Sequence, residues 1–356
     1  MSKLNVCVLF GGMSPEHEVS LRSAEFVLNC LDPEKYNIYP VGITKEGKWI
    51  LFGSTDYTML PTGSWLDCPE NCPAAISPVR GQGLLRFTED CVLQEQIDVV
   101  FPVLHGENGE DGTIQGLLQL AGIAYVGPHV SASAVAMDKT LTKLVADQAK
   151  VRQAAWHLVR SADMESRMDH ILEALENKFS YPMFVKPAGT GSSVGVSKAA
   201  DRASLREALM KAGKFDSKVL VEEFIHGREV EVAVMGNENP VASICGEIDS
   251  GADFYDYDAK YVTDTSVAYI PARISEDVSE KVREAAVAIY SAIGCQGLSR
   301  VDFFVTFENN EVVFNEINTL PGFTSISMYP KLFDASGIPG KELLDELLKL
   351  ALEAKR

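Results

Sequence analysis

Arg300-Val-Asp302 and Glu316-Ile-Asn318 lie in two segments near the C-terminus whose apolar alternation is typical of β-strands. Residues two apart on a strand point to the same face, so Arg300 shares a face with Asp302, and Glu316 with Asn318. A three-residue loop at 308–310, where Asn tolerates left-handed geometry, would place Asp302 opposite Glu316 and Arg300 opposite Asn318. The two segments therefore predict a β-hairpin with two carboxylates face to face.

Two carboxylates that face each other across a hairpin repel unless a cation lies between them. Asp302, Glu316 and Asn318 offer oxygen ligands without His or Cys, a set that suits Mg²⁺ and, with it, phosphates. The alternative is the solvated face of an ordinary hairpin. The loop that follows, residues 319–327, is rich in small and hydroxylated residues whose backbone N–H groups can bind an oxyanion, and it favours the metal site.

Length and composition restrict the possible partners. A chain of 356 residues is too long for one compact core and should hold two or three domains. Its net charge of −18 argues against a nucleic-acid partner, because affinity for phosphate backbones requires clustered Lys and Arg. No apolar run reaches membrane-spanning length, so we expect a cytoplasmic protein without a membrane partner. The seven cysteines, an odd number, indicate reduced core thiols.

The first 127 residues alternate strands and helices. We expect strands at 6–10, 38–43, 99–103 and 124–126, with helices at 19–31 and 113–121. This order predicts an α/β layer with a largely parallel sheet, whose functional loops lie beyond the carboxyl ends of the strands. Gly11-Gly12 follows the first strand but lacks the full Gly-x-Gly-x-x-Gly pattern, so it does not by itself indicate a dinucleotide site.

The remainder of the chain mixes strands and helices in two further units. Residues 128–222 predict a small α+β domain, with helices near 137–149, 168–177 and 203–212 and strands at 183–186, 194–197 and 219–222. Residues 223–356 hold strands at 230–235 and 241–248, a polar and aromatic loop at 250–265, a helix at 279–293, the hairpin, and a terminal helix after Pro339.

Two segments of the middle region suit a nucleotide. Lys186 ends a strand and precedes a glycine- and serine-rich loop whose N–H groups can fold around phosphate. It is not a Walker loop, since no Gly-Lys-Ser/Thr follows, and a tight hairpin is the alternative. The connector that begins at Glu222 can offer backbone groups to an adenine edge, and Glu229 can accept hydrogen bonds from a ribose. A solvated acidic linker would look the same.

Three further loops carry candidate side chains. His105 follows a strand in a glycine-rich turn with three acids, where a structural histidine is the alternative. A buried Glu16 could hold an ammonium group, although the same segment could simply cap a helix. Residues 255–261 could form a lid that brings Lys260 to a phosphate and Tyr261 to a substrate; surface variability is the alternative.

Taken in chain order, these motifs resemble the D-alanine–D-alanine ligases, a family of ATP-grasp enzymes. The resemblance runs almost end to end through Gly11-Gly12 with Glu16 and Val19-Ser20, Leu104-His105-Gly with residues 109–113, Met137-Asp-Lys139, Lys186-Pro with residues 191–195, residues 255–261, Arg300-Val-Asp302, and residues 316–325. It implies a three-domain ATP-grasp fold of mixed α/β and α+β class, divided at 1–127, 128–222 and 223–356, with a Rossmann-like parallel sheet in the N-terminal domain.

The resemblance also implies an activity. ATP would phosphorylate the carboxylate of one D-alanine, and the amine of a second D-alanine would attack the resulting acyl phosphate, which supplies D-alanyl-D-alanine for peptidoglycan precursor synthesis. The implied cofactors are two Mg²⁺ or Mn²⁺ ions per active site. The implied protein partner is a second copy of the chain, in a homodimer.

The resemblance implies a role for each matching residue. Those implied for catalysis are Glu16, Ser192, Tyr261, Arg300 and Gly322, with Arg300 and the Gly322 N–H at the oxyanion. Those implied for substrate binding are Val19, His105, Ser327 and Met328. Those implied for ATP are Lys139, Lys186, Ser193, Glu222, Glu223, Ile225, Glu229, Lys260, Phe304 and Asn315. The metal ligands would be Asp302, Glu316 and Asn318.

Three alternatives follow from the same motifs. Relatives that use D-serine or D-lactate share nearly all of them, but Lys260-Tyr261 speaks against D-lactate, and Met328 stands where D-serine types often carry a basic residue. Ile326 stands where many relatives have a histidine, so the resemblance does not define the shape of the second amino-acid pocket. Residues 151–156 lack the Gly-Ile/Leu-Pro that many relatives have in this linker. A nucleotide-binding regulatory protein without turnover is the alternative outside the family.

Overall fold

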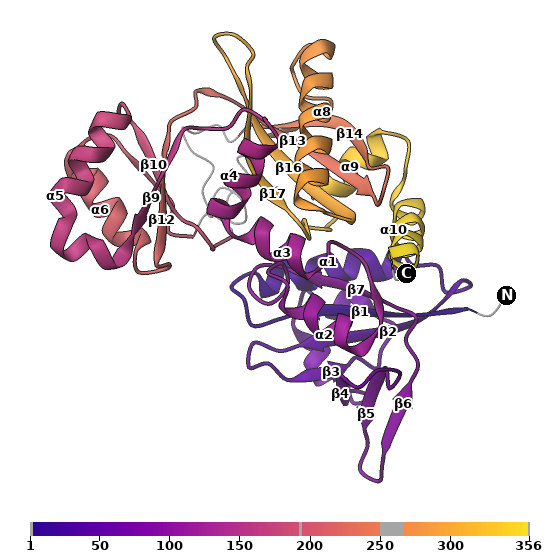
Figure 1. Cartoon of the computed structure of the whole chain (residues 1–356). Coiled ribbons are helices and arrows are strands. Elements are labelled where there is room, and N and C mark those ends of the chain that lie inside the picture. The colour runs from indigo at the N-terminus through magenta and orange to yellow at the C-terminus, as the bar shows by residue number, and fades with distance from the viewer. Residues whose placement is uncertain (1–2, 192–193, 250–266, 355–356) are drawn as a thin grey trace.

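Three separate β-sheets, each built from its own stretch of the chain, organise the computed structural model (Figure 1). It describes residues 3–191, 194–249 and 267–354. None of the helices in these ranges is both long and apolar enough to cross a bilayer. The expected lid loop and the candidates Ser192, Ser193, Lys260 and Tyr261 lie outside the described residues.

The first sheet has eight strands in the order β6-β5-β4-β3-β2-β1-β7-β8. They are β1 Leu4–Gly11, β2 Tyr36–Ile43, β3 Trp49–Leu51, β4 Cys72–Ile76, β5 Leu84–Phe87, β6 Val92–Glu95, β7 Val99–Leu104 and β8 Ala124–Tyr125. Strands β2, β1, β7 and β8 run parallel, as expected for the Rossmann-like part. Strands β3 to β6 add an antiparallel half that was not predicted, because they have only three to five residues each and β6 has no buried face.

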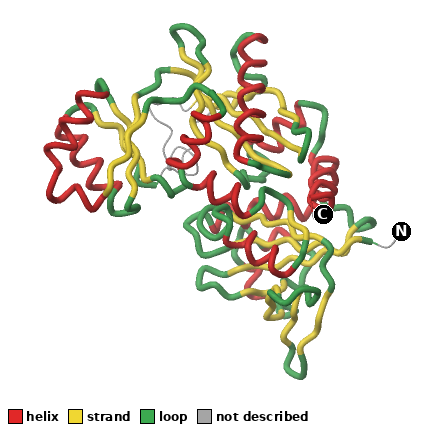
Figure 2. Tube along the Cα trace, in the orientation of Figure 1, coloured by secondary structure: helices red, strands yellow, loops and turns green. Residues whose placement is uncertain are grey.

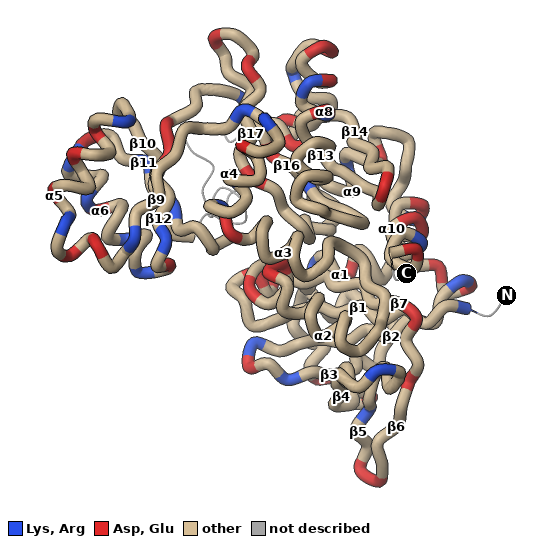
Figure 3. The backbone as a smooth tube through the Cα atoms, viewed as in Figure 1, with Lys and Arg blue, Asp and Glu red and all other residues tan. Residues whose placement is uncertain are grey.

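Strands β1 and β7 form the buried centre of this sheet. All six residues of β7 are buried, and neither strand contains a charged residue, as Figure 3 shows. Strands covered on both faces read as continuous apolar runs, which is why their positions could be predicted. Helices α1 His17–Cys30 and α2 Thr113–Ala121 follow β1 and β7, so the loops around Glu16 and His105 lie at one edge of the sheet.

The second sheet has the order β11-β10-β12-β9 and is entirely antiparallel. Its strands are β9 Trp156–Arg160, β10 Met183–Pro187, β11 Ser197–Ala199 and β12 Lys218–Glu223. Helices α5 Ser161–Lys178 and α6 Arg202–Ala212 gather on its outer side, as Figure 2 shows, and share one apolar core with it. Strand β9 was not predicted, and the strand expected at 194–197 begins at Ser197 instead.

The third sheet has the order β15-β14-β13-β16-β17. Its strands are β13 Gly227–Gly236, β14 Val241–Asp249, β15 Val267–Tyr269, β16 Gly297–Thr306 and β17 Val312–Asn318, and helices α8 Glu276–Ile293, α9 Met328–Ala335 and α10 Gly340–Ala354 accompany it. The single helix expected at 137–149 is two helices, α3 Val130–Met137 and α4 Lys139–Gln148. Asp138 separates them because its carboxylate caps α4, and both helices pack in the core of the third sheet.

The β16–β17 hairpin has the expected register at its functional end but not at its tip. Arg300 pairs with Asn318 and Asp302 with Glu316, as predicted. A register shift follows, because Phe303 pairs with Phe314 and leaves Asn315 as a bulge. The predicted three-residue loop at 308–310 is therefore wrong, because the register shift moves the tip of the hairpin by one residue. At the tip, Asn310 takes the left-handed conformation.

The first and third sheets share one hydrophobic core. One buried cluster contains Phe10 of β1, Leu298 of β16, Phe323 of the loop before α9, and Leu344 of α10. The backbones meet closely at this junction: a Cβ placed on Gly297 would lie 2.9 Å from the nitrogen of Gly127. The orientation of the third sheet against the first is thus restricted by backbone as well as by side chains.

Gly297→Ala is expected to destabilise the protein more than Gly294→Ala. Both glycines have positive φ, +71° and +79°, which costs an L-residue about 1–2 kcal/mol. Only at Gly297 does the added methyl also meet backbone, which adds about 1–3 kcal/mol of overpacking, whereas nothing lies within 4 Å at Gly294. The free energies of unfolding from urea titrations of both variants measure the difference. Equal losses would contradict the close junction.

Candidate active site

A cavity of about 420 Å³ lies between the second and third sheets. Its lining comes from the start of α4, the ends of β10 and β12, the connector into β13, and strands β16 and β17. The expected ATP-binding residues that the structure describes all line it: Lys139, Lys186, Glu222, Glu223, Ile225, Glu229, Phe304 and Asn315. Two of the expected metal ligands, Glu316 and Asn318, line it as well.

Aromatic and aliphatic side chains form part of the cavity wall. The rings of Phe184 and Phe224 stack with centroids 5.9 Å apart, and Ile225, Phe304 and Phe307 add further apolar surface. Pockets for small molecules combine such walls with a few polar groups that fix orientation. This arrangement can accommodate a flat heteroaromatic ring at one end and charged groups at the other.

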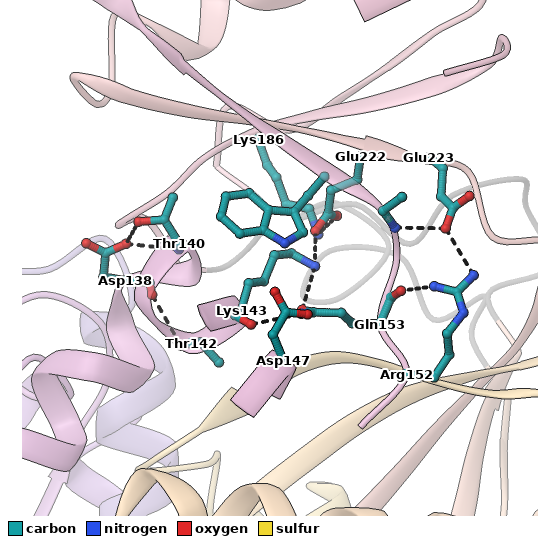
Figure 4. Close-up of polar contacts among 12 residues, drawn as sticks. Asp138, Thr140, Thr142, Lys143, Asp147, Arg152, Gln153, Lys186, Glu222 and Glu223 are labelled. Atoms are coloured by element: carbon teal, nitrogen blue, oxygen red, sulfur yellow. Dashed lines mark hydrogen bonds and ion pairs between the residues drawn. The ribbon is translucent and has the colours of Figure 1, made fainter. Parts of the chain in front are cut away.

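Three charged groups pair with one another (Figure 4), and of these Lys143 and Glu222 are buried and Lys186 is partly buried. The Glu222 carboxylate forms ion pairs with Lys143, at 2.6 Å, and with Lys186. Burial alone would raise the pKa of Glu222, but the two ammonium groups lower it to about 2. Burial likewise acts to lower the pKa of Lys186, and Glu222 outweighs it, so that the pKa is raised. At Lys143 burial outweighs Glu222, and the pKa is lowered. Glu222 and Lys186 are therefore charged at neutral pH.

The hairpin face carries a compact set of charged groups. Arg300 binds the carboxylate of Asp302 with two hydrogen bonds of 2.7 Å, through Nε and Nη2, and Asn318 donates to the same carboxylate at 2.9 Å. Glu231 of β13 approaches Arg300 to 3.1 Å. Burial would lower the pKa of Arg300, but Asp302 and Glu231 raise it well above its usual value. The guanidinium is therefore a fixed cation.

The donor set of this face fits a hard divalent cation only in part. Among residues 3–191, 194–249 and 267–354, no group of three His, Cys, Asp or Glu lies close enough to hold a metal by itself. Asp302, Glu316 and Asn318 nevertheless supply two carboxylates and an amide on paired strands. Mg²⁺ commonly takes one or two carboxylates together with water and substrate phosphates, so the set suits a metal that arrives with a nucleotide.

A buried hydrogen-bond network joins the first sheet to the loop after β17. His105 donates from Nδ1 to the carbonyl oxygen of Leu320 at 3.1 Å, and its Nε2 lies 3.1 Å from Ser23 Oγ. Ser23 in turn accepts from the Phe323 N–H at 3.2 Å. Burial acts to lower the pKa of His105, and Glu110 raises it above its usual value. The network fixes the backbone on both sides of Gly322.

Glu16 lies where the first sheet meets the glycine-rich loop after β10. A Cβ on Gly106 would come within 2.6 Å of its Oε2, and one on Gly191 within 3.5 Å. Gly106 also has a φ of +72°, a conformation that L side chains rarely adopt. The expected substrate residue Val19 is half-buried in the first turns of α1.

The remaining expected substrate residues flank α9. Ser327 precedes this helix and binds Thr324 through its hydroxyl, and a Cβ on Gly322 would lie 3.0 Å from the same hydroxyl. Met328 is buried in the core shared by the first and third sheets, close to Gly246. Ile326 is 75% exposed. The loop thus presents Gly322 and Ser327 together, while Met328 points into packed apolar surroundings.

Four residues that stand out in the structure were not predicted: Ser23, Glu110, Lys143 and Glu231. Glu231 was detectable, because it pairs with Asp302 in register and the neighbouring hairpin face was already identified. Lys143 lies four residues after Lys139, so both share one face of α4. Ser23 gives no local signal, because its partners come from distant parts of the chain. The linker at 151–156 also contributes, since Gln153 binds the backbone of Lys143.

The chain matches two family models, the D-ala D-ala ligase N-terminus over residues 5–128 and the D-ala D-ala ligase C-terminus over residues 145–349. A curated relative named D-alanine–D-alanine ligase from Caldicellulosiruptor bescii is 46% identical over all of this chain and 97% of its own length. Another of that name, from Acetivibrio thermocellus, is 48% identical over 99% of this chain and 96% of its own.

Solved structures agree with the sequence matches. The VanG D-Ala:D-Ser ligase from Enterococcus faecalis superposes with a TM-score of 0.89 at 38% identity, covering 98% of this chain and all of the other. The D-alanine–D-alanine ligase from Coxiella burnetii gives 0.85 at 34% identity, covering all of this chain and 95% of the other. The expected α/β and α+β ATP-grasp fold is thereby confirmed. With both family models matched in order and the three sheets in place, the chain belongs to the D-alanine–D-alanine ligase family of ATP-dependent ligases.

Proposed function

We propose that this chain is a D-alanine–D-alanine ligase that forms D-alanyl-D-alanine, ADP and phosphate for peptidoglycan precursor synthesis. The observation that carries the proposal is the cavity between the second and third sheets, where two partly buried lysines, Lys139 and Lys186, meet a hairpin face with oxygen ligands. An ATP-dependent ligase needs these two kinds of group next to each other, because lysines bind phosphate and oxygen ligands hold its metal.

ATP would lie in the cavity with its base against the apolar walls. The connector from Glu222 to Ile225 would meet the adenine edge, Glu229 the ribose, and Lys139 and Lys186 the phosphates. Phe304 and Asn315 line the same space. Ser193 and Lys260 stay proposals from the resemblance, since they lie outside the described residues.

Asp302, Glu316 and Asn318 would hold Mg²⁺ or Mn²⁺, two ions by the resemblance. Such ions would neutralise the negative charge of the phosphates during phosphoryl transfer. The protein's own contribution is to keep the ligands in place. Arg300 and Asn318 hold the Asp302 carboxylate in place, because both donate hydrogen bonds to it.

The two chemical steps assign roles to the remaining residues. In the first step, a carboxylate oxygen of D-alanine attacks the γ-phosphorus and ADP leaves, while Glu16 holds the ammonium group of that D-alanine. In the second, the amine of another D-alanine attacks the acyl carbon and phosphate leaves. The oxyanion formed there would accept from the Gly322 N–H and from Nη1 of Arg300, since Nε and Nη2 bind Asp302.

Further residues would position the two amino acids. Val19 and His105 would border the first D-alanine, and Ser327 and Met328 the second, with Ser192 and Tyr261 completing the site from outside the described residues. We also propose the domain division 1–127, 128–222 and 223–356, which follows the three sheets except that β12 extends to Glu223 and that α3 and α4 pack in the core of the third sheet. A homodimer rests on the resemblance alone, and a cytoplasmic location rests on the sequence, in which no apolar run reaches membrane-spanning length.

D-serine as the second amino acid is the other candidate, favoured by the similarity to the VanG D-Ala:D-Ser ligase. One observation favours D-alanine. The curated relatives named for D-alanine are 46% and 48% identical to this chain, against 38% for the VanG D-Ala:D-Ser ligase.

Incubation with ATP, Mg²⁺ and D-alanine is expected to release phosphate and D-alanyl-D-alanine in equal amounts. Phosphate release by a coupled assay and the dipeptide by mass spectrometry measure the two products. L-alanine is the matched control and should give neither. ATP binding without D-alanine-dependent phosphate release would instead support a regulatory nucleotide-binding protein.

In competition between D-alanine and D-serine at equal concentration, the mixed dipeptide should be the minor product. The reason is that the curated relatives named D-alanine–D-alanine ligase are more similar to this chain than the VanG D-Ala:D-Ser ligase is. The ratio of kcat/KM for the two second substrates measures the preference. A ratio in favour of D-serine would overturn the assignment of D-alanine.

Glu316→Gln should lower kcat by about 100-fold or more, because an amide replaces a charged ligand of the metal. Glu308→Gln makes the same change at the tip of the same hairpin, on a side chain that is 66% exposed and pairs with His226, and should stay within about twofold. Initial rates over a Mg²⁺ titration compare the two variants. Near-normal rates in Glu316→Gln would refute the metal assignment.

A further inference from the structure

Lys143 stands directly behind the cavity that we assign to ATP. Its side chain is 3% exposed, its ammonium lies 2.6 Å from Glu222 Oε1, and it is absent from the cavity lining although Glu222 and Lys186 are present there. Glu222 lines the cavity and Lys143 does not, and Figure 4 shows the Lys143 side chain directed towards Glu222 and Lys186. A contact between Lys143 and ATP would require the carboxylate to move away.

The position of Lys143 is well supported by the surrounding structure. Gln153 donates from Nε2 to the Lys143 carbonyl oxygen at 2.8 Å and to Asp147 at 2.5 Å, and its Oε1 lies 3.5 Å from the Lys143 ammonium. Helix α4, which carries Lys143, begins at the Asp138 cap and packs in the core of the third sheet. Lys143 thus reaches from the third-sheet side to β12 of the second sheet.

The charges of the cluster explain why a second lysine is useful. Lys186 and Glu222 alone would be a neutral pair, and a buried carboxylate deprived of its partner is strongly destabilising. If Lys186 turned towards a phosphate, Glu222 would lose its only neutralising group. With Lys143 present, two ammonium groups and one carboxylate leave one net positive charge, and Glu222 keeps a partner when Lys186 moves.

We propose that Lys143 is a positioning residue whose ammonium holds the Glu222 carboxylate and so makes Lys186 available to the phosphates of ATP. The inference rests on the proposed nucleotide site and deepens it. It does not depend on ligase turnover, because it concerns the binding of the nucleotide alone. Because the interaction acts through charge, loss of Lys143 should weaken the binding of ligands that carry phosphates more than the binding of ligands without them.

The test is to measure the binding of MgATP and of adenosine to Lys143→Met by calorimetry in the absence of D-alanine. We expect the Kd for MgATP to rise about tenfold or more, since Lys186 becomes committed to Glu222, while the Kd for adenosine stays within about twofold. Lys143→Arg, which keeps the charge, should bind MgATP within about threefold of the unchanged protein. Lys150→Met removes an exposed lysine after the same helix and should leave both constants unchanged.

The double variant Lys143→Met/Glu222→Gln separates charge from packing. Removal of the carboxylate releases Lys186 again, so the double variant should bind MgATP more tightly than Lys143→Met. Additive losses in the double variant, or equal losses for ATP and adenosine, would overturn the proposal and indicate a structural role. A chain that binds MgATP as expected but forms no dipeptide would contradict the proposed ligase and leave this inference standing.

Discussion

Three carboxylates in one cross-strand row constrain the active-site region. Glu231, Asp302 and Glu316 pair in register across β13, β16 and β17, so their side chains leave the same face of the third sheet. Arg300 supplies the protein's own counter-charge, with two bonds to Asp302 and an ion pair to Glu231. Lys186 adds a further positive charge near Glu316. In the proposed function, metal ions would add more positive charge beside this row of acids.

The register of this hairpin could be predicted because side chains alternate with a period of two. For Asp302 to lie opposite Glu316, the residues of the loop and of any bulge between them need only add up to an odd number. The structure meets this condition in a different way from the one expected, with a shift between Asp302 and Phe303 and a bulge at Asn315. A bulge inside an apolar strand leaves no composition signal. The loop length was therefore wrong although the functional pairing was correct.

Other elements show the same distinction between local and distant signals. Buried parallel strands such as β1 and β7 could be predicted, because burial on both faces makes them continuously apolar. The antiparallel strands β3 to β6 could not, since they are short and half-exposed. In the site, loop residues beside glycines were identified from their own segments. Ser23 and Lys143 were not, because their partners Phe323 and Glu222 are far away in sequence.

Charge distribution reconciles the acidic chain with a polyphosphate ligand. The net charge of −18 would repel ATP at long range, but that repulsion is screened beyond about 8 Å at physiological ionic strength. Around Glu222 the local balance is reversed, because Lys143 and Lys186 both pair with one carboxylate, whereas the cavity lining as a whole holds more acidic than basic residues. Burial strengthens this local field relative to the solvated surface charges.

The first sheet contributes to the site mainly by fixing backbone. His105 binds the Leu320 carbonyl and Ser23 binds the Phe323 N–H, so one buried network restrains the residues on both sides of Gly322. An N–H that stabilises an oxyanion is effective only when it is oriented before the charge develops. Since His105 and Ser23 lie on the first sheet and its helix, while Gly322 follows the third, the packing of the two sheets would set the orientation of the proposed oxyanion donor. Their close junction at Gly127 and Gly297 is the backbone contact on which that geometry depends.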